Sequence, residues 1–300
     1  MWAQQDRFAD LAVFRAAVAA MGYDAIEVSH STAQTGLETL LVLRGKDEIG
    51  VSSLHAPTPR RTLPDGRNNS NANLASPDEA QRREAINEHK RTIDYAAAHA
   101  IPFVVVHLGG VGDTMHDYEL ELRHRFDAGE RDGEQVDHLR DHLIRWRAAN
   151  RGPYLEAGAR SLRELVDYAA PHNIALGLEN RYHYHEIPHP DEAQSVLAPY
   201  SNAQAGYWHD TGHAEVQARM RLIDRYAWFP ALTPRTIGSH LHDVLGIGDH
   251  RAPGAGDVDW AYIAAGLPPT ALRVFEIDQR QPDEAVAASI AFLREKGVVS

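Results

Sequence analysis

The feature that most constrains the fold of this chain is a regular alternation of short apolar segments with longer segments of helical periodicity. Seven apolar segments, rich in Val, Ile and Leu, occur along the 300 residues. Because most of them lack strict alternation of apolar and polar residues, they are typical of strands in a parallel sheet that is buried on both faces. The predicted strands span residues 25–29, 49–55, 103–107, 174–179, 205–210, 236–242 and 271–277.

Segments with apolar residues at helical spacing separate these strands. The predicted helices span residues 8–21, 76–100, 156–170, 191–197 and 282–296. Since strands and helices alternate from end to end without a break in composition, we expect a single α/β domain over residues 1–300.

The order of these elements favours a (β/α)8 TIM barrel, which is built from eight strand–helix units. The chain enters on a helix and then shows seven strands. We therefore expect the first barrel strand to be missing or truncated, either because it is absent from this sequence or because the native start lies upstream. A doubly wound open sheet is the alternative, but no glycine-rich phosphate-binding turn follows an early strand. The charged segment 109–152 is expected to be a helical insertion after the fourth barrel strand, with a lid or an oligomer contact as the alternative.

Composition excludes several classes of protein. The chain contains no cysteine, which rules out disulfides, thiolate metal sites and cysteine nucleophiles. Its formal net charge of −12 argues against nucleic acid and anionic membranes as partners. No apolar run reaches the roughly 20 residues of a membrane helix, so we expect a cytoplasmic protein. The 18 histidines direct attention to metal binding and proton transfer.

Imidazole and carboxylate side chains stand at the carboxyl ends of six predicted strands. In a parallel barrel these ends meet at one mouth, where catalytic groups are placed. A single polar residue at a strand end is ordinary, but six together are costly to bury unless they share a cation or protons. The set is typical of ligands for Mn²⁺, Mg²⁺, Zn²⁺ or Co²⁺. It comprises His55, His107, Glu179, Asp210, His240 or His242, and Glu276.

Seven motifs follow one another along the chain: GYDAIEVSH, SSLHAP, VVVHLGG, LGLENR, WHDTGHAE, HLHD with GDHRAPGAGDVDW, and RVFEID. Together they resemble the xylose isomerase-like TIM-barrel superfamily, which contains sugar (phosphate) isomerases and epimerases and the endonuclease IV family. The resemblance covers residues 22–278. It implies one divalent metal ion, whose ligands would be Glu179, Asp210, His240 and Glu276. His240 is preferred to His242 because the family pattern places an acid, here Asp243, three residues after the histidine.

Three further histidines match positions of known members of the superfamily. His213 matches a position that contacts substrate in epimerases or a further metal ion in endonuclease IV. His55 and His107 match two histidines of the endonuclease IV pattern. Two or three metal ions are therefore an alternative to one.

The chain also departs from the endonuclease IV pattern. His250 matches another histidine of that pattern, but the acid expected two residues earlier is Gly248, and Asp249 stands beside it. Thr58 occupies the position of a tyrosine that opens DNA in endonuclease IV. Together with the negative net charge, these departures argue against DNA repair.

The resemblance implies proton transfer on a sugar, a sugar phosphate or a polyol through a metal-stabilised enediolate. A divalent ion that chelates a carbonyl oxygen and its neighbouring hydroxyl would acidify the adjacent C–H. Glu179 and Glu276 would then remove and return the proton. The substrate contacts expected nearby are Arg181, His183, His185, Glu186 and His213.

Other functions are compatible with the same residues. A dehydratase uses the same metal and enolate chemistry as an isomerase. A multinuclear zinc phosphodiesterase resembling endonuclease IV would take its additional ligands from His55, His107, His213, Asp249 and His250. A sugar-binding barrel without activity is disfavoured by the complete ligand set. The resemblance also implies a homo-oligomer.

Overall fold

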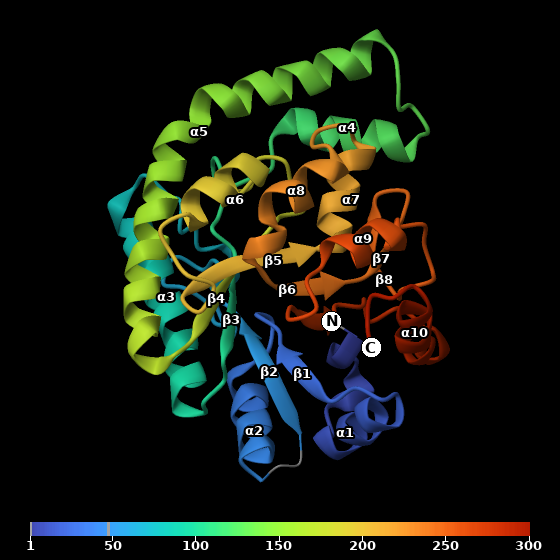
Figure 1. Cartoon of the computed structure of the whole chain (residues 1–300). Coiled ribbons are helices and arrows are strands. Elements are labelled where there is room, and N and C mark those ends of the chain that lie inside the picture. Colours follow the sequence, from blue (N-terminus) through green and yellow to red (C-terminus); the bar gives the residue numbers. More distant parts are fainter. Residues whose placement is uncertain (1, 47–48) are drawn as a thin grey trace.

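The computed structural model describes residues 2–46 and 49–300, and its centre is a sheet of seven parallel strands rolled into a barrel (Figure 1). Each strand begins and ends within two residues of its predicted span, so the predicted TIM-barrel fold is confirmed. In the described residues, β1 pairs only with β2, and β9 pairs only with β6. In spatial order the strands are β1 (Ala25–Val28), β2 (Gly50–His55), β3 (Phe103–Val106), β4 (Ala175–Glu179), β5 (Ala205–Asp210), β6 (Thr236–Leu241) and β9 (Leu272–Phe275).

Helices connect the strands and cover the outside of the barrel (Figure 1). They are α1 (Leu11–Ala20), α2 (Gln34–Gly45), α3 (Glu79–Ala98), α4 (Asp117–Asp127), α5 (Glu134–Ala169), α6 (Pro190–Leu197), α7 (Thr211–Arg219), α8 (Trp228–Leu232), α9 (Trp260–Gly266) and α10 (Asp283–Glu295). Between β6 and α9, β7 (Asp243–Leu245) and β8 (Gly248–Arg251) form an antiparallel hairpin. Among the described residues, no helix combines the length and apolarity needed to cross a membrane.

Trp208 of β5 fills the inside of the barrel. Its side chain is fully buried and packs with Val105 and Ile237 from other strands. A Cβ atom at Gly238 would lie 2.2 Å from the indole ring, so only glycine at this position of β6 leaves room for the ring. Asp210 stands two residues farther along β5 and therefore on the same inner face. Along β5, the apolar interior of the barrel ends at Trp208, and the polar groups at the carboxyl end begin with Asp210.

The charged segment 109–152 contains α4 and the first part of α5, but residue 152 is not a structural boundary. α5 continues through Pro153, so the helix predicted over residues 156–170 is the second half of one 36-residue helix. Pro153 cannot donate a backbone hydrogen bond inside the helix, which accounts for a bend. In Figure 1, the first half of α5 lies across the top of the barrel with α4, and the second half runs down beside α3.

A buried ion pair joins α5 to α6. The side chains of Arg147 and Glu192 are only 3% and 1% exposed, and their two hydrogen bonds measure 2.6 and 2.8 Å. Although burial by itself raises the pKa of Glu192, the bonds from Arg147 lower it from 4.5 to about 2. The pair therefore stabilises the fold above pH 4.5, and this contribution is lost as the pH falls toward 2.

We predict that Glu192→Gln lowers the free energy of unfolding by about 3–5 kcal/mol, because it leaves the Arg147 guanidinium buried without a counter-charge. Urea unfolding at neutral pH measures the loss, which should shrink in acid. Asp191→Asn is the matched control, since Asp191 pairs with Arg151 but its side chain is 68% exposed, and little change is expected. Equal losses in the two variants would contradict the buried-pair interpretation.

Candidate metal and catalytic site

Four carboxylates meet around His240 at the carboxyl end of the barrel. Glu27 comes from β1, Glu179 ends β4, Asp210 ends β5, and Glu276 directly follows β9. Parallel strands bring these ends to one mouth. One ligand atom from each of Glu179, Asp210, His240 and Glu276 lies within 4.8 Å of the others. The structure thus brings together the four side chains that the sequence analysis selected as metal ligands.

His240 is oriented by Glu27. Its Nε2 donates a hydrogen bond of 2.8 Å to Glu27 Oε1. With the proton on Nε2, the lone pair of Nδ1 faces Glu276 Oε2 at 3.2 Å, Glu179 Oε1 at 3.4 Å and Asp210 Oδ2 at 3.7 Å. A carboxylate that sets the tautomer of a ligating histidine is a common feature of metal sites.

The centre of this cluster attracts positive charge. Among the described residues, His240 Nδ1 and Glu179 Oε1 are buried without a hydrogen-bond partner. Although burial alone lowers the pKa of His240, the carboxylates of Glu27 and Glu276 raise it well above its usual value. A divalent cation bound here would contact both unpartnered atoms and offset the carboxylate charges. The donor set therefore fits a metal ion that prefers oxygen and nitrogen ligands.

His242 also carries its proton on Nε2, but in this ring the protonated nitrogen is the one that faces the carboxylates. The backbone N–H of His250 donates to His242 Nδ1 at 2.8 Å, so the proton of the neutral ring is on Nε2. This nitrogen lies 3.0 Å from both oxygens of Asp210 and donates to them. Because a protonated nitrogen has no lone pair for a metal ion, His242 orients Asp210. The geometry favours His240 as the ligand.

His213, Asp249 and His250 lie together beside Asp210. His213 Nδ1 donates to the backbone oxygen of Asn180 at 3.0 Å, and its Nε2 is 3.8 Å from Asp249 Oδ2. The other oxygen of Asp249 lies 2.9 Å from His250 Nδ1. Burial lowers the pKa of His250, but the bond to Asp249 and the charge of Glu276 outweigh it and raise the pKa to about 10. Asp249 therefore links the two histidines.

His55 and His107 lie on the other side of Glu179. Their Nε2 atoms are 2.7 Å apart, and they lie 3.3 and 2.9 Å from Glu179 Oε2. Arg181 Nη1 donates to His107 Nε2 and is 3.7 Å from Glu179 Oε1. A permanent positive charge therefore stands beside these two histidines.

The remaining predicted substrate contacts divide into two groups. Glu186 Oε1 accepts a hydrogen bond of 3.0 Å from Arg181 Nε, which places it near the mouth. The ring nitrogens of His183 and His185 instead face Glu119 of α4, at 3.1 and 3.8 Å. In the described structure these two histidines thus join their loop to α4 rather than to the carboxylate cluster.

Sequence analysis missed two residues of the site, Glu27 and His30. The second oxygen of Glu27 accepts a hydrogen bond of 2.6 Å from Ser53 Oγ. The ring of His30 packs edge-on against that of His55, with centroids 5.0 Å apart, and burial together with His55 lowers the pKa of His30 to about 4. The available signal for Glu27 was a lone carboxylate inside an apolar strand, a costly position unless the charge is paired.

Comparisons with known proteins agree with this architecture. A protein-family model described as xylose isomerase-like TIM barrel matches residues 15–296. No curated protein matches the chain in sequence.

Several solved structures share the fold at low sequence identity. D-Psicose 3-epimerase with D-tagatose from Clostridium cellulolyticum H10 is 14% identical, with a TM-score of 0.64 over 97% of this chain and 94% of that one. L-Ribulose 3-epimerase is 15% identical, with a TM-score of 0.65 over 97% and 89% of the two chains. The IolI protein with a bound zinc atom is 14% identical, with a TM-score of 0.61 over 96% and 92%. At these identities the similarity establishes the fold alone.

We predict that Glu27→Gln weakens Co²⁺ binding by about 10–100-fold, because His240 loses the carboxylate that orients it. Isothermal titration calorimetry, in which Co²⁺ is added to chelator-treated protein, measures the affinity. Near-ultraviolet circular dichroism checks the fold. Glu38→Gln, on the exposed face of α2, is the control and should bind like the unaltered protein. An unchanged affinity in Glu27→Gln would show that Glu27 does not position the ligand.

Proposed function

The chain belongs to the xylose isomerase-like TIM-barrel family, and we propose that it is a divalent-metal-dependent isomerase or epimerase of a sugar, a sugar phosphate or a polyol. The observation that carries this proposal is the convergence of Glu179, Asp210, His240 and Glu276 on one point of the mouth. The names of the similar solved structures, which include two ketose 3-epimerases, support the same class of substrate.

A divalent ion held by these four residues would supply a Lewis acid that polarises a carbonyl and its neighbouring hydroxyl. Glu179 and Glu276 extend from β4 and from the end of β9, three positions apart around the barrel. One carboxylate removes the C–H proton, and the electron pair of that bond moves into the C=C bond of an enediolate. The other carboxylate returns a proton. Return to the opposite face gives epimerisation, and return to the adjacent carbon gives isomerisation.

Other side chains of the mouth orient the substrate. The Arg181 guanidinium lies beside Glu179, where it stabilises negative charge that develops on the substrate oxygens. Glu186 holds Arg181 in this position through its Nε hydrogen bond. His213 offers Nε2 to a substrate hydroxyl, since its Nδ1 is engaged by the Asn180 carbonyl. A dehydratase would use the same proton abstraction, followed by loss of a hydroxyl from the enolate.

We predict that Glu179→Gln and Glu276→Gln each reduce turnover by about 10²–10⁴-fold while the fold is retained, because an amide cannot accept the substrate proton. The assay supplies Mn²⁺ and a panel of ketoses, inososes and their phosphates in D₂O, and mass spectrometry detects deuterium exchanged into carbon. Glu284→Gln, exposed on α10, is the matched control. A fully active Glu276→Gln enzyme would contradict the assignment.

A multinuclear phosphodiesterase is the second candidate, because three further groups among the described side chains are arranged closely enough to hold ions. They are His55 with His107 and Glu179, Glu27 with His55 and His240, and Asp210 with His213, His242 and His250. Two observations favour a single ion. Arg181 Nη1 donates to His107 Nε2 and so occupies the lone pair that this nitrogen would offer to an ion. The proton on His242 Nε2 points at Asp210 and leaves no lone pair for a second ion.

Metal stoichiometry separates the two candidates. We predict one ion per chain, Mn²⁺, Mg²⁺ or Co²⁺, when protein purified without chelator or a histidine tag is analysed by inductively coupled plasma mass spectrometry. Two or three Zn²⁺ ions per chain, with cleavage of abasic DNA or of a small phosphodiester, would instead support the phosphodiesterase.

A further inference from the structure

The loop that carries Arg181 into the mouth is anchored to the helical insertion. This segment, residues 180–189, leads from β4 to α6 and is called the β4–α6 loop below. The Arg181 side chain extends from it to Glu179 and His107. The insertion contributes α4 and the first half of α5, which lie across the top of the barrel (Figure 1). Contacts between the insertion and this loop therefore bear on the position of Arg181.

Glu119 of α4 is the centre of these contacts. Its side chain is fully buried, and Oε1 accepts a hydrogen bond of 2.9 Å from Arg123 Nη2 of the same helix. From the β4–α6 loop, His183 Nδ1 lies 3.1 Å from Oε1, and the backbone N–H of Tyr184 donates to Oε2 at 3.0 Å. Burial alone raises the pKa of Glu119, but the bonds from His183 and His185 and the charge of Arg123 outweigh it and lower the pKa. Glu119 is therefore an ionised acceptor inside the contact.

Two arginines of the insertion hold further points of the loop backbone. Arg123 Nη2 donates to the Tyr182 oxygen at 2.9 Å, and the guanidinium stands 4.1 Å from the centre of the Tyr182 ring, a cation–π distance. From α5, Arg147 Nη2 donates to the Glu186 oxygen at 2.8 Å. The backbone is thus bonded to the insertion at residues 182, 184 and 186.

Glu186 connects this fixed backbone to the guanidinium of Arg181. Its Oε1 accepts from Arg181 Nε at 3.0 Å, and its Oε2 accepts from the backbone N–H of His183 at 2.9 Å. A long side chain such as arginine loses rotamer freedom when its head group is held in one place. The anchored loop supplies the fixed partner that this requires. A chain of hydrogen bonds therefore runs from α4 to Arg181.

The same contacts bear on the role of the insertion. A lid that opened would separate α4 from the loop and remove the Tyr184 and His183 donors from the buried Glu119 carboxylate. Separating a buried charge from its partners is costly. The contacts therefore favour a fixed support over a lid.

We propose that Glu119 is a positioning residue, which holds Arg181 beside Glu179 through the backbone of the β4–α6 loop. This inference rests on the proposed function, because Arg181 serves the reaction only if charge develops on a substrate oxygen beside it. It also gives His183 and His185 a role, since they anchor the loop to α4 instead of binding substrate.

The first test replaces Glu119 with glutamine and measures how firmly Arg181 is held. The amide nitrogen must face a donor in either orientation, Arg123 at Oε1 or the Tyr184 N–H at Oε2. Modification of Arg181 by phenylglyoxal, followed by mass spectrometry of peptides containing residue 181, needs neither metal nor substrate. We expect Glu119→Gln to speed this modification about fivefold or more, because the loop opens locally.

Glu215→Gln is the matched control. Glu215 of α7 is also buried and pairs with an arginine four residues later, Arg219, at 2.7 Å. In the described part of the chain, no hydrogen bond joins Glu215 to the β4–α6 loop. This variant should leave the modification rate of Arg181 unchanged. Equal acceleration in the two variants, or none in Glu119→Gln, would overturn the proposal.

The second test is kinetic and uses the Mn²⁺-loaded enzyme with a ketose that exchanges deuterium. Because Arg181 stabilises charge that develops only during proton transfer, Glu119→Gln should lower kcat by about 10–100-fold and change KM by less than about twofold. In an Arg181→Met background, Glu119→Gln should cause no further loss, since the two residues act through one path. Additive losses would overturn the proposal.

Arg123→Lys provides a second variant in case Glu119→Gln folds poorly. Lysine keeps the positive charge beside Glu119 but lacks the planar fork that bonds Glu119 and the Tyr182 oxygen together. Arg181 should again be modified faster, in a protein whose near-ultraviolet circular dichroism is unchanged. An unchanged rate in this folded variant would overturn the proposal by itself.

The two tests also separate this inference from the proposed function. Faster modification of Arg181 in Glu119→Gln, together with no deuterium exchange into any substrate by the unaltered protein, would overturn the proposed function while supporting the anchoring of Arg181. Deuterium exchange by the unaltered protein, with equal kcat in Glu119→Gln, would keep the proposed function and overturn the positioning role of Glu119.

Discussion

The concentration of carboxylates around one imidazole is the constraint on which the rest of this structure depends. Buried like charges repel one another strongly in a medium of low dielectric constant, so each needs donors of its own. The protein surrounds the cluster with such donors and orients each oxygen by doing so. Ser53 and His240 donate to Glu27, and His242 and the backbone N–H of His213 donate to Asp210. The positive charge of Arg181 lies 3.7 Å from Glu179, and His250 lies 3.8 Å from Glu276. The donors leave His240 Nδ1 and Glu179 Oε1 for a cation.

The barrel beneath the mouth holds these groups at their separations. Asn180, directly after β4, donates through Nδ2 to the backbone oxygen of Asp210. Its Oδ1 accepts hydrogen bonds from the backbone N–H of Asp210 and from the hydroxyl of Tyr207. This side chain therefore fixes the ends of β4 and β5 relative to each other, and with them the carboxylates of Glu179 and Asp210. Below it, the fully buried indole of Trp208 fills the interior of the barrel.

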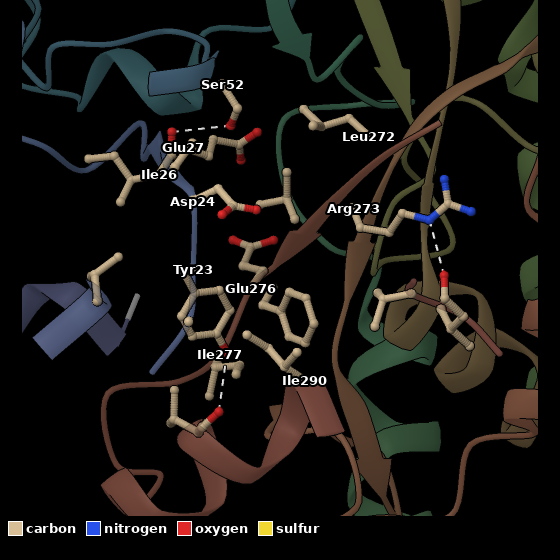
Figure 2. Close-up of a pocket in the computed structure, with 18 of the residues that line it drawn as sticks. Tyr23, Asp24, Ile26, Glu27, Ser52, Leu272, Arg273, Glu276, Ile277 and Ile290 are labelled. Carbon is tan, nitrogen blue, oxygen red and sulfur yellow. Dashed lines mark hydrogen bonds between the residues drawn. The ribbon is translucent and has the colours of Figure 1, made fainter. Parts of the chain in front are cut away.

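The candidate site and the cavity between β1 and β9 share side chains. Glu27 orients His240, and Glu276 stands at the centre of the cluster, yet both also line the cavity between β1 and β9. The carboxylate of Glu276 therefore belongs both to the cluster and to the wall of this cavity (Figure 2). Shielding from water strengthens every charge interaction in such a site.

The sequence by itself determined the strands, the barrel and the polar groups at the strand ends, because apolar periodicity and strand termination are local properties. It also marked the insertion as helical, although only packing showed that α5 runs on through Pro153. Only the tertiary structure decided which ring nitrogen of His240 carries the proton and which has a free lone pair. The partner that decides it, Glu27, is 213 positions away in the sequence. It also decided that Arg181 faces the cluster while His183 turns to α4. These outcomes depend on side-chain contacts between distant segments, and such contacts exist only once the barrel has brought the segments together.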